Sequence, residues 1–418
     1  MRTLEQIIER NRAGQAVGLP AYCSAQPETL RAVLAEYAHD DEPVLLAASA
    51  NQVNQFGGYA GMTPSGFRNF IDILATGEGV DPARIMLAGA HLGPYPWRDE
   101  PAATAMDRAK DLVRAYVDAG FDTLHLNATV PCAAEEPLSE GEMARRAATL
   151  CAVAEASSGG RPLRYVLTAG TSRPGGETGG LDRLLPAAPQ SVQRSLEHIE
   201  AAFADADLRG ALDRVIAVVA EPGAGFDNSL VRGFDPNRIA GLGDVILAIP
   251  GAVFEAAAAD YQTEAGLAAL VAHHFAILKV GPELGLAFRQ AVVAMTHLEG
   301  FLDVHPSCLL SIIDDEMAFD PADWQEHVAA DDRASAMRLF GLSDRVRYFW
   351  ARPRIAAALQ TLFSNINAAH PEAGLIAQYV PADLPGIDPH LPLSTRMIRS
   401  QVGAVVRKLR RATRSTPI

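Results

Sequence analysis

Two histidines and a lysine that close or follow apolar runs are the side chains of this sequence best suited to chemistry. His91 ends "IMLAGAH", His125 lies in "DTLHLNA", and Lys279 lies in "FAILKV". A divalent metal needs several protein ligands, so two histidines supply part of a site and make His91 a candidate metal ligand. The alternative is that each histidine is only hydrogen-bonded in place. Lys279 could form a Schiff base, hold a phosphate as a point charge, or pair with Glu255; we favour contact with a phosphate or substrate.

The segment "NQVNQFGGYAGMTP" gathers side-chain amides and glycines. Asn51, Gln52, Asn54 and Gln55 each carry donors and an acceptor, which suits the hydroxyl groups of a sugar. Amides in loops also satisfy backbone groups, and for any single one of the four this structural role is the stronger expectation. For the cluster as a whole we predict ligand binding.

Further candidates lie at the ends of other apolar runs and in the last quarter of the chain. "SDRVRYFW" places Arg345 and Arg347 two residues apart, where they could reach a phosphate or tie the C-terminal part to the rest. Gly281 and Pro282 open a helical segment whose N-terminus could hold a phosphate. The remaining candidates are polar residues at the ends of apolar runs: Cys23, Ser24, Ser49, Asn127, Thr168, Thr171, Glu221 and Glu255.

These residues are positioned by a regular alternation of apolar runs and helical segments. Eight runs, from "AVGLPAYC" to "FAILKV", are continuous enough to be strands buried on both faces, and segments such as "TAMDRAKDLVRAYVDAG" separate them. Eight such units over residues 1–300 predict a (β/α)8 TIM barrel, whose chemistry lies at the C-terminal ends of its strands. A doubly wound open sheet is the alternative, but no Gly-rich phosphate loop follows the first run. Residues 301–418 predict an α-helical C-terminal extension packed on the barrel.

Composition narrows the classes of partner. The chain has 418 residues and a formal net charge of -14, which argues against binding to nucleic acid. No stretch holds the roughly 20 apolar residues that a membrane span needs. None of the four cysteines forms a CxxC pair and no signal peptide is evident, so we expect a cytoplasmic protein with reduced thiols. No nucleotide-binding motif supports a phosphotransfer activity.

Six segments resemble the D-tagatose-1,6-bisphosphate aldolase subunit family, the Z subunits of galactitol and N-acetylgalactosamine catabolism. They are "NQVNQFGGYAGMTP", "HLGPYPW", "YVDAGFDTLHLN", "FEAAAADYQT", "HHFAILKVGP" and "SDRVRYFW", in the family's order over nearly the whole chain. The resemblance implies a TIM barrel with a helical C-terminal part. It also implies a role in hexose-phosphate metabolism, as the non-catalytic partner of a class II, zinc-dependent aldolase. It further implies a small phosphorylated sugar as ligand and zinc or another divalent metal as cofactor, and we expect an oligomer. Some relatives act alone as epimerases, and many carry a kinase label that the motifs here do not support.

The chain departs from the family pattern at strand ends. Where the resemblance implies Glu, Asp, Glu and His in turn, this sequence has small residues: Ala47, Ala90, Gly170 and Ala257. Retro-aldol and epimerase reactions both need a base and a metal, so these changes predict a catalytically degenerate subunit without a working zinc site. The alternative is a stand-alone, metal-dependent ketohexose-phosphate epimerase or aldolase that uses the retained His91, His125 and Lys279.

Overall fold

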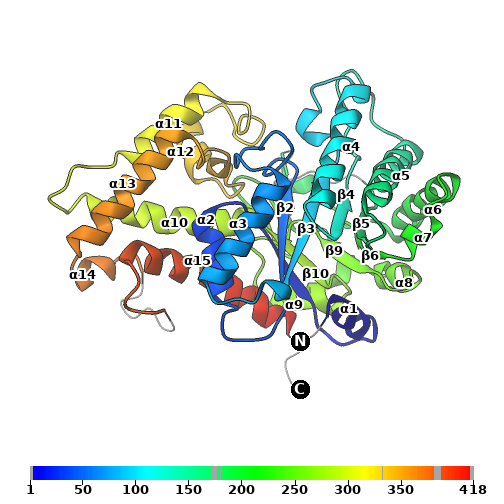
Figure 1. Cartoon of the computed structure of the whole chain (residues 1–418), viewed down its shortest axis with the longest axis horizontal. Helices are drawn as coiled ribbons and strands as arrows, with labels where there is room; N and C mark the ends of the chain where they lie inside the picture. Colours follow the sequence, from blue (N-terminus) through cyan, green and yellow to red (C-terminus); the bar gives the residue numbers. More distant parts are fainter. Residues whose placement is uncertain (1–2, 171–176, 179, 332, 381–386, 415–418) are drawn as a thin grey trace.

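Eight parallel strands close into a barrel, as the apolar runs predict (Figure 1). The computed structural model describes residues 3–170, 177–178, 180–331, 333–380 and 387–414. Around the barrel the order is β1, β2, β3, β4, β5, β6, β9, β10 and back to β1. The bounds are Leu19–Cys23 (β1), Val44–Ser49 (β2), Ile85–Leu92 (β3), Thr123–Leu126 (β4), Arg164–Thr168 (β5), Val215–Val219 (β6), Val253–Ala256 (β9) and Ile277–Val280 (β10). Most of these residues are buried, because the barrel interior lies on one face of each strand and the helices on the other.

Helices cover the outside of the barrel and confirm the (β/α)8 prediction. They are α2 (Pro27–Ala35), α3 (Pro64–Gly77), α4 (Ala102–Asp118), α5 (Glu140–Ser157), α6 (Pro189–Asp205), α7 (Arg209–Leu212), α8 (Leu242–Leu247), α9 (Glu264–Ala272) and α10 (Pro282–Glu299). The hydroxyl oxygens of Thr63, Ser139 and Thr263 accept N–H groups from the first turns of α3, α5 and α9. Such caps satisfy backbone donors that have no partner within the helix and fix where it begins.

A short helix at the start of the chain closes one end of the barrel. Helix α1 (Leu4–Arg12) is held by a capping box at Thr3, and its apolar face presents Leu4 and Ile7. These side chains belong to the same buried cluster as Leu19 and Leu45, which lie near the starts of their strands. With the N-terminal end filled in this way, the C-terminal ends of the strands are left to form a site.

One feature of the barrel was not predicted. After β6, the two-residue strands β7 (Gly225–Phe226) and β8 (Val231–Arg232) pair in an antiparallel hairpin outside the barrel sheet. Two residues are too few to produce a periodic pattern, so no sequence signal marks them.

The last quarter is helical where it is described, which confirms the predicted extension. Its helices are α11 (Leu309–Phe319), α12 (Ala334–Phe340), α13 (Pro353–Ala369), α14 (Ala373–Ile376) and α15 (Leu393–Thr413). Helices α11 and α13 lie beside α10, away from α4 to α8 (Figure 1). Helix α15 returns to the barrel, packs against α2, α9 and β1, and accepts the Gly18 N–H at the carbonyl of Thr413. The extension therefore contributes to the barrel wall, and the domain boundary at residue 300 stays a prediction.

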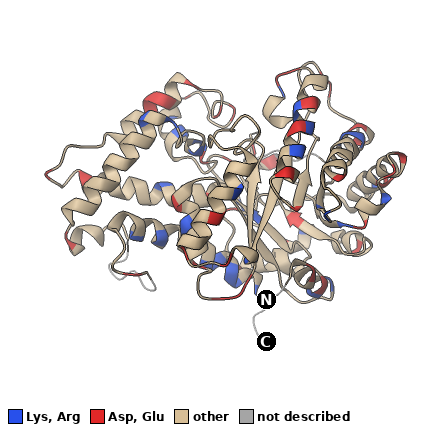
Figure 2. Cartoon of the chain, viewed as in Figure 1, with Lys and Arg blue, Asp and Glu red and all other residues tan. Residues whose placement is uncertain are grey.

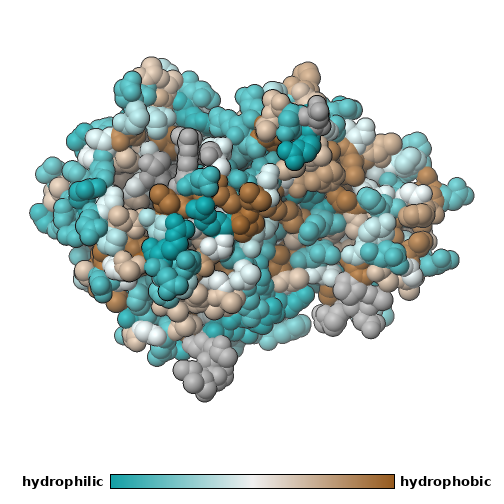
Figure 3. Space-filling model, turned by 180° about the vertical axis from the view of Figure 1, so that it is seen from behind, coloured by the Kyte–Doolittle hydropathy of each residue, from teal (hydrophilic) through white to brown (hydrophobic). Residues whose placement is uncertain are grey.

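The outer surface mixes charges and apolar groups. Figure 2 shows acidic and basic residues interspersed along the outer helices. Figure 3 shows the opposite face, where apolar residues gather near the centre among polar ones. Within the described ranges, no helix is long and apolar enough to cross a lipid bilayer.

Candidate functional site

Four side chains from four strands meet in a hydrogen-bonded chain inside the mouth of the barrel. The Lys279 ammonium donates to the Glu255 carboxylate and, over 3.1 Å, to Nδ1 of His125. Nε2 of His125 in turn lies 2.9 Å from Oγ1 of Thr168. Lys279, Glu255 and His125 are only 5, 3 and 2 % exposed. Their strands β10, β9, β4 and β5 therefore hold an ion pair away from solvent.

These contacts determine which nitrogen of His125 carries a proton. A lysine ammonium has no acceptor, so Nδ1 of His125 must accept and its proton must lie on Nε2, which donates to Thr168. Burial, reinforced by the nearby charge of Lys279, lowers the pKa of His125 well below its usual value. The imidazole is therefore neutral at pH 7, and its Nδ1 lone pair accepts the hydrogen bond from Lys279.

His91 occupies an unusual backbone position beside this chain. Its φ of 51° is left-handed, and the register between β3 and β4 shifts between Gly89 and Leu92. Its ring centroid lies 4.7 Å from that of His125, and its Nδ1 lies 2.9 Å from the side-chain nitrogen of Asn127. The amide oxygen of Asn127 accepts from Thr129, so the amide nitrogen donates to His91. Burial and Lys279 lower the pKa of His91 as well, which makes it a second neutral imidazole.

The residues at this mouth do not fit a divalent metal. Nδ1 of each histidine accepts a hydrogen bond, and the tautomers that follow put a proton on each Nε2, so neither ring offers a free electron pair. The Lys279 ammonium, 3.1 Å from His125, would also repel a metal cation. Among the residues that the structure describes, no group of three or more His, Cys, Asp or Glu could hold a metal ion. We therefore assign no zinc site to His91.

The side-chain amides of the segment "NQVNQFGGYAGMTP" mostly form hydrogen bonds to backbone groups. Oε1 of Gln52 accepts the Ser49 N–H at 2.8 Å, and Oδ1 of Asn54 accepts the N–H groups of Phe56 and Gly58 at 2.9 and 3.0 Å. Gln55 donates to the carbonyl of Arg108 at 3.0 Å. Gly58 is required here, because a Cβ at its φ of 58° would lie 2.5 Å from the carbonyl oxygen of Gln52. Three of the four predicted amides thus carry structural hydrogen bonds.

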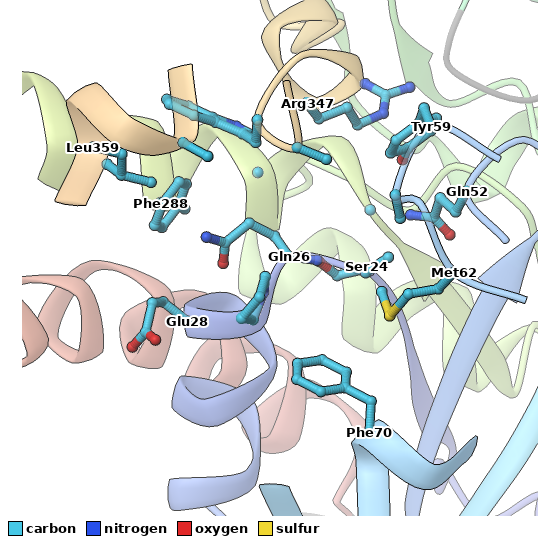
Figure 4. Close-up of a pocket in the computed structure, with 18 of the residues that line it drawn as sticks. Ser24, Gln26, Glu28, Gln52, Tyr59, Met62, Phe70, Phe288, Arg347 and Leu359 are labelled. Atoms are coloured by element: carbon cyan, nitrogen blue, oxygen red, sulfur yellow. The ribbon is translucent and has the colours of Figure 1, made fainter. Parts of the chain in front are cut away.

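Two cavities open between this mouth and the extension, and neither includes the four-residue chain. The first, the polar cavity, has a volume of about 280 Å³ and is lined by residues that include Asn51, Asn54, Tyr95, Trp97, Arg98, Glu326, His327 and Arg345. The second, the apolar cavity, has a volume of about 330 Å³ and is lined by residues that include Ser24, Gln26, Gln52, Met62, Phe288, Arg347, Trp350 and Leu359 (Figure 4). The apolar cavity lies at the lower end of the size range of small-molecule sites, and the polar cavity lies just below it.

A stack of aromatic rings and guanidinium groups divides the two cavities. Tyr348 packs on Tyr59 with ring centroids 4.3 Å apart, and both cavities are lined by Tyr59. The guanidinium carbons of Arg345 and Arg347 lie 4.2 and 4.8 Å from the Tyr348 ring centroid. Although burial opposes it, these two cations lower the pKa of Tyr348. The two arginines, which are two residues apart in the sequence, therefore line different cavities.

The N-terminus of α10 corrects one prediction. Oδ1 of Asp260 accepts the N–H groups of Gly281 and Glu283 at 2.9 and 2.8 Å, so these donors are not available to a phosphate. Burial raises the pKa of Asp260 to about 7. Sequence reasoning missed this carboxylate because it lies beyond the end of β9, although an acid near a strand end is the kind of signal that could have revealed it.

Of the other strand-end candidates, the Cys23 thiol donates to Oε1 of Gln52 at 3.3 Å, and two bind backbone N–H groups. Oγ of Ser24 accepts the Gln26 N–H at 3.2 Å, and Glu221 accepts the Gly223 N–H at 2.7 Å. Burial raises the pKa of Glu221 to about 7. Thr171 lies outside the described residues.

Comparisons with known proteins agree over almost the full length. Residues 4–414 match the family model "D-tagatose-1,6-bisphosphate aldolase subunit GatZ/KbaZ-like". The chain is 40% identical over 386 residues to D-tagatose-1,6-bisphosphate aldolase subunit GatZ of Klebsiella pneumoniae, covering 90% of this chain and 91% of that one. It is 39% identical to GatZ of Salmonella typhimurium over the same shares.

A solved structure supports the same assignment. The crystal structure of a probable tagatose 6 phosphate kinase from Sinorhizobium meliloti 1021 superposes with a TM-score of 0.82 at 34% identity, covering 94% of this chain and 100% of that one. The resemblance found in the sequence is confirmed, and the chain belongs to the GatZ/KbaZ-like family of D-tagatose-1,6-bisphosphate aldolase subunits.

Proposed function

We propose that this chain is a subunit of a D-tagatose-1,6-bisphosphate aldolase that assists a class II catalytic subunit and does not itself cleave the substrate. Family membership and the names of the GatZ relatives support the subunit role and the place in carbohydrate metabolism. The observation that carries the non-catalytic part is the buried ammonium of Lys279, paired with Glu255 and directed at His125.

The chemistry of the mouth supports this division of labour. Class II cleavage of a ketose needs an electrophilic metal for the developing enolate and a base for the hydroxyl proton. Here the Glu255 carboxylate, which could act as a base, is paired with Lys279, and His125 already accepts from the same ammonium. A Lys279 ammonium held in a buried ion pair has no free electron pair, so a Schiff base with the substrate carbonyl is equally unsupported.

The polar cavity is the place we assign to a phosphorylated sugar. Arg345 and Arg98 line it and offer the guanidinium groups that suit a phosphate, and Asn51 adds an amide for hydroxyl groups. Arg98 is paired with Glu326 at 3.3 Å, which leaves Arg345 as the better candidate for the phosphate. Binding in this cavity requires no metal and is compatible with a subunit that recognises substrate without converting it.

The test is a reconstitution. The purified chain, the class II aldolase of the same organism, and their mixture are each supplied with zinc and tagatose 1,6-bisphosphate, and release of triose phosphate is followed by a coupled assay. We expect no turnover by the chain alone and a higher or longer-lasting rate in the mixture than with the aldolase alone. Turnover by the zinc-loaded chain alone, at a rate comparable to that of the mixture, would refute the non-catalytic assignment.

A further inference from the structure

We propose that the apolar cavity is a second ligand site, which binds a small carboxylic acid with an aromatic or aliphatic body. This site is independent of the proposed subunit role, because it lies on the opposite side of Tyr348 from the polar cavity. The cavity lies between the loop after β1, helices α3 and α10 of the barrel, and helix α13 of the extension.

One end of the cavity suits an apolar body. Phe288 of α10, Leu359 of α13, Phe70 of α3 and Met62, just before α3, approach from three sides (Figure 4). Trp350 completes this wall and packs edge-on against Phe288, with ring centroids 5.1 Å apart. A sugar placed here would lose hydrogen bonds from its hydroxyl groups to water, so the wall selects against carbohydrate.

The polar groups on the wall include one cation, Arg347, and one carboxylate, Glu28. Nη1 of Arg347 donates to the backbone carbonyl of Asp344 at 3.0 Å, and within the described residues its guanidinium forms no ion pair. Glu28, a carboxylate on the same wall, is paired with Arg31 at 3.5 Å. Arg347 therefore provides a positive charge that no carboxylate within the described ranges meets directly, and a ligand anion would complete it.

A second donor lies beside this cation. Gln26, whose Oε1 accepts the Thr29 N–H at 2.6 Å, keeps its amide nitrogen as a further donor at the centre of the cavity (Figure 4). A guanidinium without an ion pair and an amide donor, both beside an apolar wall, suit the carboxylate and the body of an organic acid.

The experiment compares three probes on the full-length chain. Phenylpropionate has both the acid and the apolar body, phenylpropionamide lacks the charge, and acetate lacks the body. Binding is measured by ligand-observed NMR at millimolar concentrations. We expect phenylpropionate to bind about tenfold more tightly than either of the other probes, because it alone satisfies both ends of the cavity.

Matched variants locate the site. Arg347→Met removes the cation, and Ala356→Leu adds apolar volume to the cavity from α13 while every charged residue of the wall is kept. Each should weaken phenylpropionate binding by about tenfold. Arg345→Met removes the corresponding guanidinium on the other side of Tyr348 and should leave binding unchanged.

Three results would overturn the proposal. They are equal binding of phenylpropionate and its amide, undiminished binding to Ala356→Leu, and equal weakening by Arg345→Met and Arg347→Met. Arg347 also donates a hydrogen bond to the backbone of its own loop, so Arg347→Met could fail to fold. In that case binding to Ala356→Leu tests whether the ligand occupies this cavity. None of these measurements uses aldolase activity, so failure here is distinguishable from failure of the proposed function.

Discussion

Lys279 defines the character of the barrel mouth, because a single ammonium satisfies Glu255 and occupies the accepting nitrogen of His125. The strand-end rule of TIM barrels selected all three residues from the sequence. The sequence offered the pairing of Lys279 with Glu255 only as an alternative to contact with a phosphate or substrate, and the structure shows that pair. The contact of Lys279 with His125 was not foreseen, since it depends on the lengths and directions of the side chains once the barrel has closed.

Removal of Lys279 should be costly for the fold. In Lys279→Met the Glu255 carboxylate, 3 % exposed, loses its counterion, and we expect the free energy of unfolding to fall by about 3–5 kcal/mol. The double variant Lys279→Met/Glu255→Leu should recover most of this loss. Urea denaturation followed by circular dichroism measures both. Lys110→Met removes an exposed ion pair with Asp107 and should change stability by no more than about 0.5 kcal/mol. A loss as small as this for Lys279→Met would show that the buried pair is not closed in solution.

The two neutral histidines should make stability fall in mild acid. In the unfolded chain His91 and His125 take up protons below about pH 6.5. In the folded chain their lowered pKa values keep them neutral, so the unfolded state binds more protons and is favoured as the pH decreases. Each histidine contributes full stability above about pH 6.5 and loses about 1.4 kcal/mol per pH unit below it, until its folded pKa is reached.

A variant separates this effect from that of Asp260 and Glu221. Burial raises the pKa of both acids to about 7. Their contribution to the free energy of unfolding therefore changes with pH in the opposite sense and decreases as the pH rises. The pH dependence of the wild type alone is therefore ambiguous. We expect the stability difference between wild type and His125→Gln to shrink between pH 7.5 and 5.5 in urea denaturation. A difference that stays constant over this range would mean that His125 titrates in the folded state as it does in the unfolded chain, so that its pKa is not lowered by burial.

At the scale of elements, the strands were predictable and the loops that connect them to the extension were not. Apolar runs such as β2 and β6 are buried along their whole length, and this leaves a continuous signal in the sequence. The wall between the two cavities depends instead on Tyr59 and Tyr348, which are far apart in the sequence and meet only after the extension has folded over the barrel. Arg345 and Arg347 each line a cavity, their role in binding stays a prediction, and their division between two cavities follows from the packing of Tyr348 between them.

The attachment of the extension depends on close contact at Gly285. A Cβ at Gly285 of α10 would lie 2.0 Å from Oδ2 of Asp344, which is completely buried and paired with Arg289 at 3.2 Å. We expect Gly285→Ala to lower the free energy of unfolding by about 1–3 kcal/mol through overpacking. Hydrogen exchange should quicken around residues 341–350 while the strands stay protected.

The matched control for that substitution is Gly210→Ala. Gly210 has no heavy atom within 4 Å of the added Cβ, so this variant should be as stable as the wild type and keep slow exchange in the extension. If Gly285→Ala behaves in the same way, Asp344 is not fixed against α10 as the structure describes.

At the scale of the whole molecule, α15 links the two ends of the chain. It packs against α2, α9 and β1, and Arg399 and Arg410 carry ion pairs to Glu78 and Asp40. A protein that ended at residue 300 would lack this helix and would expose apolar residues on the barrel wall. The expected division into a barrel of residues 1–300 and an extension packed on it stays a prediction, and the contacts of α15 make independent folding of residues 1–300 the point to test.

Truncation tests whether the barrel needs its last helix. Residues 1–392 lack α15, and residues 1–300 lack the whole extension. Because both expose the sides of α2 and α9 that α15 covers, we expect each to aggregate or to lose cooperative thermal unfolding, as followed by size-exclusion chromatography and circular dichroism. Residues 1–414, which keep α15, should behave like the full chain. A monodisperse, cooperatively unfolding protein of residues 1–300 would instead establish the barrel as an independent domain, and would make α15 a cover added to a wall that is already stable.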